Sequence, residues 1–366
     1  MNRLRCRSGA GSRAAWRGFT LVELMIALTI GLLLLGGLVN VFVGSSRAHA
    51  ELKKASEHTE NGSMAMWILS KNAYAAGYFG EFYMLPESGG ALPDACATTV
   101  PELYAALAFP VQGYDAPAAS PLACLSDNDF VPGTDILVIR RADATALAPA
   151  DVPITNEVYL QGMATTAEIQ LGSGSSAVGT TLKADGTPAD IYKKNGSTAA
   201  DSRKFHVHIY FVAPCSVPGN GGNSCTGAGD DGGNPVPTLK RLELTAVGGA
   251  TAWRMVPLVE GVQNLQVDYG IDNLPAAQNP ATGQFGDGAP DVYVASPATA
   301  DWPNVVSVKV HLLARATQRT PGHTDVKTYD MGLAGPAGAF NDAYKRHQFS
   351  GVMRLVNVSG RREIPQ

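Results

Sequence analysis

The sequence predicts an α+β protein in which one long N-terminal helix precedes an antiparallel β-sheet domain. An apolar stretch begins at Phe19 and reaches Val43, and the chain continues without proline to Ala76. Further on, short runs alternate between apolar and polar residues, as half-buried strands do. Charged residues make up only 16% of the chain, and the chain contains 40 Gly and 23 Pro. This composition favours strands joined by long loops over a helical bundle.

The long helix is expected to have two halves, 19–43 and 44–79. The first half is long enough to cross a bilayer, which takes about 20 apolar residues. The second half carries apolar and small residues at steps of three and four, which favours docking of its far end on a globular domain. Gly77 is expected to end the helix. The remaining parts are a leader, 1–18, and an extracytoplasmic β-rich domain, 80–366.

Seven segments of the β-rich domain read as strands. In the second of them, Phe205 and Val207 alternate with His206 and His208. The two histidines share one strand face, as zinc ligands do, but the sequence offers no third ligand. We therefore favour a strand face that looks into solvent over a metal site. The predicted strands are 135–140, 205–211, 238–244, 262–269, 292–294, 305–314 and 351–358.

The junction between the leader and the apolar stretch combines several unusual features. The leader carries five arginines and no acidic residue. It ends in Gly18-Phe19, and Glu23 follows as the single charged residue of the first helix half. An ionisable side chain inside a membrane segment is costly, so Glu23 is a candidate functional residue.

These residues resemble the class III signal of type IV prepilins. In that family a membrane-embedded aspartyl peptidase cuts after the Gly and methylates the new amino terminus. The resemblance implies cleavage between Gly18 and Phe19, N-methylation of Phe19 and a role for Glu23 in assembly. The alternative is an ordinary secretory signal, which is cut at small residues beyond the apolar stretch, near Ala50. That alternative explains neither Glu23 nor the Gly-Phe junction.

Further likeness lies in five segments, 60–62, 76–80, 133–137, 258–262 and 305–315, which look like those of the PilW family of minor type IV pilins. The likeness implies a pilin-like fold, in which a transmembrane and fibre-core helix packs on a C-terminal antiparallel sheet. The chain departs from the family in one place that concerns its cysteines. Such chains commonly have a Cys directly after the Gly-Tyr-Phe-Gly segment, whereas Glu81 follows here.

Four of the five cysteines lie beyond the helix, and Cys6 lies in the leader. Outside the cytoplasm an even set favours disulfides, although four cysteines allow three connectivities. We expect local pairs, Cys96 with Cys124 and Cys215 with Cys225, because each closes a loop-rich segment. A zinc site is the competing interpretation, but no C-x-x-C pair supports it.

A split acidic loop is the only other metal candidate. PilW-like chains often carry a compact Asp-x-Asp-x-Asp-Gly loop after a Tyr-Gly strand end, and such loops suit calcium. Here an insertion, 273–285, separates Asp272 from Asp287 and Asp291. We favour a solvated turn here, and calcium binding by these three carboxylates is the alternative. We expect no cofactor.

The charge balance argues against broad affinity for nucleic acid. The formal net charge is −4, and loss of the leader's five arginines would make it −9. Such an acidic chain does not attract the phosphate backbone over long range. Serine, aspartate and histidine residues are present, but none stands in a nucleophile-elbow or phosphate-loop context. We therefore expect that the protein is not an enzyme.

The resemblance implies a minor pilin that takes part in the initiation and assembly of type IV pili. Its expected partners are the prepilin peptidase, other minor pilins, the major pilin, a PilY-type adhesin and, before assembly, inner-membrane lipid. Glu23 would be neutralised by a neighbour's methylated amino terminus. Two alternatives stay open: a J-type pseudopilin of a type II secretion system, and a pilus-tip module that binds a surface or DNA.

Overall fold

The structure is a computed structural model that describes residues 18–87, 90–147, 154–172, 191–193, 200–222, 224–274 and 286–363. Contacts divide the chain into two units, residues 1–53 and residues 54–366. Helix α1, Leu21–Ala75, begins in the first unit and ends in the second. Its 55 residues confirm the single long helix that the proline-free sequence predicts.

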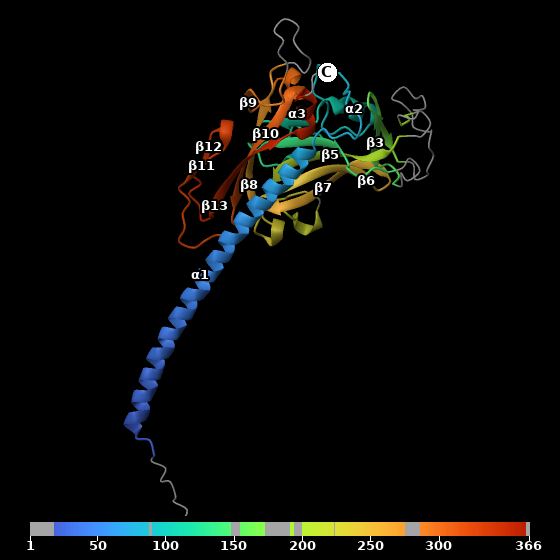
Figure 1. The fold of residues 1–366 in the computed structure, drawn as a ribbon. Helices are drawn as coiled ribbons and strands as arrows, with labels where there is room; N and C mark the ends of the chain where they lie inside the picture. Colours follow the sequence, from blue (N-terminus) through green and yellow to red (C-terminus); the bar gives the residue numbers. More distant parts are fainter. Residues whose placement is uncertain are drawn as a thin grey trace, which may run out of the picture. The chain divides into compact units, whose positions relative to one another are not determined.

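The larger sheet of the second unit has seven strands (Figure 1). Strand β5, Ser202–Ala213, lies at its centre, because β2 pairs with one side of it while β3 and β6 share the other. All of these pairings are antiparallel. The other strands are β1 (Val111–Tyr114), β2 (Ile136–Ala142), β3 (Val158–Met163), β4 (Thr166–Leu171), β6 (Thr238–Val247) and β7 (Ala250–Glu260).

A second antiparallel sheet has the order β13-β10-β8-β9. Its strands are β8 (Val262–Ile271), β9 (Val292–Val294), β10 (Val305–Arg315) and β13 (Arg346–Arg354). A short pair, β11 (Thr328–Asp330) with β12 (Pro336–Gly338), completes the strands of the described residues. Figure 1 shows the end of α1 lying against this β-rich part, which confirms the predicted α+β class.

The main core lies between the last turns of α1 and both sheets. Ala65, Leu69 and Ala73 of α1 are fully buried there, and small side chains let the helix backbone approach the strands. Burial of a leucine such as Leu69 contributes roughly 1.5–3 kcal/mol. Partners from the strands include Tyr210 and Val212 of β5, Val267 of β8 and Val310 of β10.

The opposite face of the seven-stranded sheet has its own core. Val207, Ile209 and Phe211 of β5 pack there under a short helix, α2, Val100–Ala105. Both faces of β5 are therefore covered.

The end of the chain differs from its predicted form. The predicted strand 351–358 is correct only to Arg354, where β13 ends, and helix α3, Val356–Glu363, follows. The β-branched valines at 356 and 358 suggest a strand, but tertiary contacts decide otherwise. Asn357 donates hydrogen bonds from Nδ2 to the carbonyl oxygens of Tyr74 and Ala76, at 3.3 and 3.2 Å. Helix α3 thereby satisfies carbonyls that the end of α1 leaves without partners.

Candidate functional site

The start of α1 holds the three residues singled out at the leader junction. Gly18, Phe19 and Thr20 precede the helix, which begins at Leu21. Phe19 is 82% exposed. Glu23 lies in the first turn, on the helix end that carries unpaired N–H groups.

Thr20 and Glu23 form a reciprocal capping box. Glu23 Oε2 accepts hydrogen bonds from the backbone N–H and from the hydroxyl of Thr20, both at 3.0 Å. In return, Thr20 Oγ1 accepts the backbone N–H of Glu23 at 3.2 Å. The arrangement fixes the point at which the helix begins. It also gives the only acidic group of the apolar stretch hydrogen-bond donors within its own chain.

The following turns of α1 expose large apolar side chains. Leu33 is 77% exposed and Phe42 is 73% exposed. By length and composition, α1 is the one helix among the described residues that is suited to crossing a membrane. An apolar surface of this extent marks contact with lipid or with partner helices.

Two parts of the chain match known protein families. Residues 226–357 match the family described as Type IV Pilus-assembly protein W, and residues 17–39 match the prokaryotic N-terminal methylation motif. Together these matches support a PilW-type pilin with a prepilin-type signal. No curated protein and no solved structure matches it. The matches confirm the resemblance inferred from the sequence, and the second of them contains Gly18, Phe19 and Glu23.

Two disulfides join the four cysteines of the pilin's β-rich part. Cys96 pairs with Cys124 and Cys215 pairs with Cys225, with Cα atoms 5.6 and 5.9 Å apart. This confirms the expected local connectivity. The ammonium group of Lys240 lies 4.0 Å from the Cys215 sulfur and 3.9 Å from the Cys225 sulfur. Burial lowers the pKa of Lys240.

The described residues bring one possible metal-binding group together, Cys215, Cys225 and Asp230. Its sulfurs are bonded to each other and therefore supply no thiolate ligands. Asp230 accepts hydrogen bonds from the backbone N–H groups of Gly219, Thr226 and Gly227 at 2.7–2.8 Å. This carboxylate organises the loop that the disulfide closes.

The calcium candidates are held by donors of the chain itself. Asp272 Oδ2 accepts hydrogen bonds from Nε of Arg362 and from the Gly288 N–H, both at 3.0 Å. Asp287 and Asp291 each accept a backbone N–H at 2.9 and 2.8 Å. A guanidinium therefore occupies one side of Asp272, and calcium binding stays the less favoured alternative.

Of the two histidines of β5, His208 lies against α1, and His206 is half-buried with its Nε2 3.4 Å from Oδ2 of Asp143. His208 is buried, and its Nδ1 lies 3.2 Å from Oδ1 of Asn72 on α1. The solvent-facing interpretation is wrong for His208, because α1 covers this face of the sheet. Burial, followed by the charge of Arg241, holds the pKa of His208 well below its usual value. The ring is neutral at pH 7 and serves as a hydrogen-bonding group of the core.

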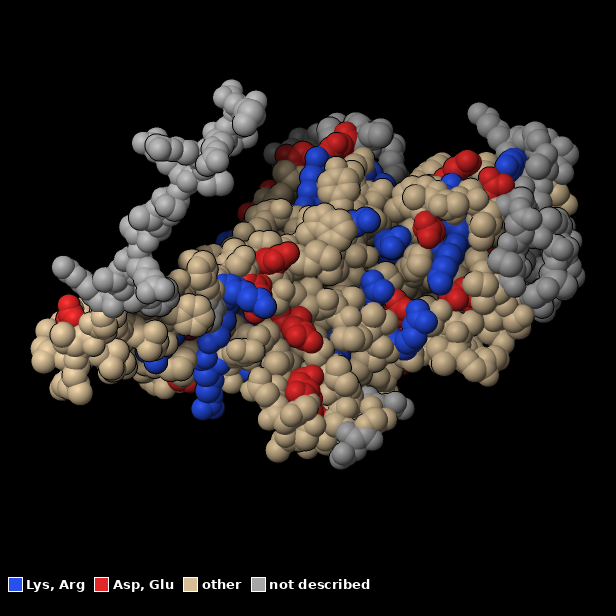
Figure 2. Space-filling model, turned by 90° about the horizontal axis from the view of Figure 1, so that it is seen from below, with Lys and Arg blue, Asp and Glu red and all other residues tan. Residues whose placement is uncertain are grey.

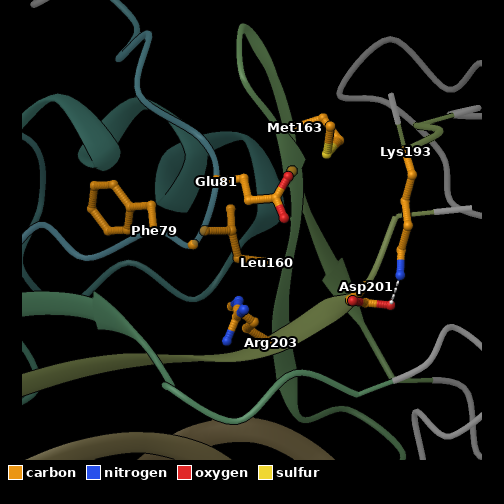
Figure 3. Close-up of a pocket in the computed structure, with 9 residues that line it drawn as sticks. Phe79, Glu81, Leu160, Met163, Lys193, Asp201 and Arg203 are labelled. Carbon is orange, nitrogen blue, oxygen red and sulfur yellow. Dashed lines mark ion pairs between the residues drawn. The ribbon is translucent and has the colours of Figure 1, made fainter. Parts of the chain in front are cut away.

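A small polar hollow lies between the segment after α1 and strands β3 and β5 (Figure 3). Lys193 and Asp201 form an ion pair of 2.9 Å at one side, and Arg203 lies at another. The hollow has a volume of about 20 Å³, which is room for a single water molecule. It is therefore too small to hold a substrate.

The charged side chains of the pilin are mixed in sign. Figure 2 shows Lys and Arg interspersed with Asp and Glu over one face of the molecule. That face offers no continuous basic stripe of the kind that binds nucleic acid. The DNA-binding alternative therefore gains no support from this face.

Sequence reasoning missed two features of the pilin. The capping box has a readable signature, because Thr20 and Glu23 have the T-x-x-E spacing. The contact between His208 and Asn72 has none, since it depends on which face of β5 the helix covers.

Proposed function

We propose that this PilW-type pilin takes part in initiating and assembling type IV pili by polymerisation through α1. The prepilin peptidase cuts after Gly18 and methylates the amino group of Phe19. The processed subunit waits in the inner membrane with its β-rich domain in the periplasm, where its disulfides are stable. It then joins other minor pilins, the major pilin and a PilY-type adhesin in the fibre.

The position of Glu23 is the observation that carries this proposal. It lies four residues after Phe19 and is the single charged residue of the stretch up to Val43, whose large apolar side chains are exposed. In a fibre core, where apolar helices exclude water, this carboxylate needs a positive partner. The methylated amino terminus of a neighbouring subunit supplies one.

Replacement of Gly18 by Arg tests the processing step. A bulky charged side chain next to the scissile bond should prevent cleavage, so the variant should keep its leader. Intact-mass measurement of the wild-type membrane form should give a chain that starts at methylated Phe19. A mature terminus near Ala50 would contradict the proposal.

Replacement of Glu23 by Ala tests the pairing step. Insertion and leader cleavage should persist, because loss of a charge favours an apolar segment. Incorporation into fibres should be lost, since the neighbour's amino terminus then lacks a partner. The assay compares surface pili and fractionated protein in a strain without the native copy. Normal pilus number with normal incorporation of the variant would refute the pairing role.

The same strains separate this proposal from the pseudopilin alternative. A pilus subunit should be needed for surface fibres while type II secretion continues. Loss of secretion with normal pili would instead favour the J-type pseudopilin.

A further inference from the structure

An open groove of about 760 Å³ lies between helix α3 and the segment that follows α1. Apolar and aromatic side chains line it, among them Phe82, Tyr83 and Met84. Tyr83 is 50% exposed and Met84 is 55% exposed, so the rim offers apolar surface to solvent. Arg361 of α3 is the charged residue of this groove.

The groove is formed before any ligand arrives. Asn357 and Arg361 tie α3 to carbonyl groups at the end of α1, the latter by a 2.9 Å hydrogen bond from Nη2 to the Gly77 oxygen. On the other wall, the backbone N–H groups of Tyr83 and Met84 donate to the carbonyl of Ala164, at 3.0 and 3.3 Å. A preformed site loses little conformational freedom on binding.

Arg361 lacks a counter-charge among the described residues. Its guanidinium contacts the Gly77 carbonyl and lies 5.8 Å from the Phe79 ring centre, and its Nη1 is buried without a hydrogen-bond partner. Burial lowers the pKa of Arg361 to about 10, and no carboxylate of the described residues offsets this effect. A cation that is desolvated and unpaired is costly to the free protein.

Two other arginines near the end of the chain form ion pairs with carboxylates. Arg362 pairs with Asp272 at 3.0 Å, and Arg354 pairs with Glu363. The unpaired charge is therefore specific to Arg361, the arginine that faces the groove.

A ligand that fits these features is an apolar segment that carries one negative charge. A single guanidinium balances a carboxylate, whereas a phosphate dianion would keep surplus charge. The groove exceeds the size of a small free carboxylate, and its open, apolar walls suit the side chains that flank an acidic residue in a peptide.

We propose that this groove binds an extended segment of another pilus subunit, in which an Asp or Glu lies between apolar residues. The carboxylate pairs with Arg361, whose terminal torsion turns Nη1 toward it, and the apolar neighbours contact Tyr83 and Met84. The identity of the partner rests on the proposed function, whereas the recognition chemistry does not.

Peptide binding tests the recognition directly. The full chain, reconstituted in lipid nanodiscs, is titrated with a fluorescent peptide Gly-Ser-Leu-Glu-Val-Phe-Gly-Ser and with its Glu-to-Gln counterpart. The acidic peptide should bind about tenfold more tightly, as expected for a hydrogen bond to a charged group. In Arg361→Gln the two peptides should bind equally. The control Arg254→Gln, which alters an exposed arginine paired with Glu243, should keep the tenfold difference.

A second variant locates the apolar contacts. Met84→Ser changes an exposed rim residue, so the protein should stay folded while both peptides bind more weakly by a similar factor. Equal binding of the two peptides to the wild type, absence of binding, or a preserved difference in Arg361→Gln would each overturn the proposal. Because no fibre is needed, failure here leaves the pilus-assembly test unaffected.

Discussion

One face of β5 carries two histidines whose burial disfavours the protonated form of the imidazole ring. His206 and His208 have ring centres 5.3 Å apart, and His208 contacts Asn72 of α1. Burial, followed by the charge of Arg141, lowers the pKa of His206 to about 4. Cations on three strands surround this pair, namely Arg141 of β2, Lys204 of β5 and Arg241 of β6. The contact between helix and sheet should therefore be sensitive to acid.

Replacement of His208 by Gln should remove part of this sensitivity. A histidine whose folded pKa is depressed contributes stability that is present above pH 6.5 and is lost as the pH falls toward its folded pKa. Between pH 7 and pH 5 the wild type should lose about 2 kcal/mol through this group, because the unfolded chain takes up the proton. Glutamine keeps a donor for Asn72 but does not titrate. Urea unfolding at both pH values measures the loss, and an equal loss in the variant would contradict this origin.

At the scale of elements, the fit between α1 and β13 depends on the absence of a side chain at Gly62. A Cβ atom added there would lie 2.0 Å from Cε2 of Phe349 on β13. Glycine inside a helix costs about 0.5–1 kcal/mol relative to alanine. The tight contact with the Phe349 ring explains why this cost is accepted.

Replacement of Gly62 by Ala should destabilise the protein by about 1 kcal/mol. Forced packing of an extra methyl group costs about 1–3 kcal/mol and outweighs the gain in helix propensity. In a Phe349→Leu background the ring is gone, so the same change should be neutral or stabilising. Chemical unfolding of the two single variants and the double variant measures both effects. A stabilising Gly62→Ala in the wild-type background would show that the ring moves at no cost.

The strands that the sequence predicted best are those whose residues are apolar along the whole length of the strand. β8 and β10 read as apolar runs, and both lie within the second sheet with few exposed residues. β7 was missed, because it is a half-buried strand with a single buried residue, contains Pro257 and pairs on one side with β6. Strands of that kind carry a weak apolar pattern, and their existence depends on the partner.

Sequence separation explains why the disulfides could be predicted from the sequence and the groove could not. Each disulfide closes a local loop, with separations of 28 and 10 residues, so nearness in sequence implied nearness in space. Arg361 and Tyr83 come to line one groove only after α3 has docked on the end of α1. No local pattern encodes a contact over that sequence separation.

At the scale of the whole molecule, leader removal and disulfide formation should be visible in a single thiol count. Cys6 lies in the leader, and the other four cysteines are paired. The mature pilin should therefore offer no alkylatable thiol, while the uncut Gly18→Arg precursor should offer one. Mass spectrometry after alkylation without reductant gives both counts. Two or more free thiols in the mature chain would contradict the pairing.

The capping box would give the proposed assembly step the character of a ligand exchange. Oε2 of Glu23 is already held by the N–H and the hydroxyl of Thr20. Cleavage after Gly18, as proposed, would leave a single residue, Phe19, ahead of that box. A neighbouring amino group would then have to compete with Thr20 for the same carboxylate, so the subunit would pass from self-capped to cross-capped without exposing a bare charge to lipid. In this proposal Thr20 is the leaving ligand of the polymerisation step.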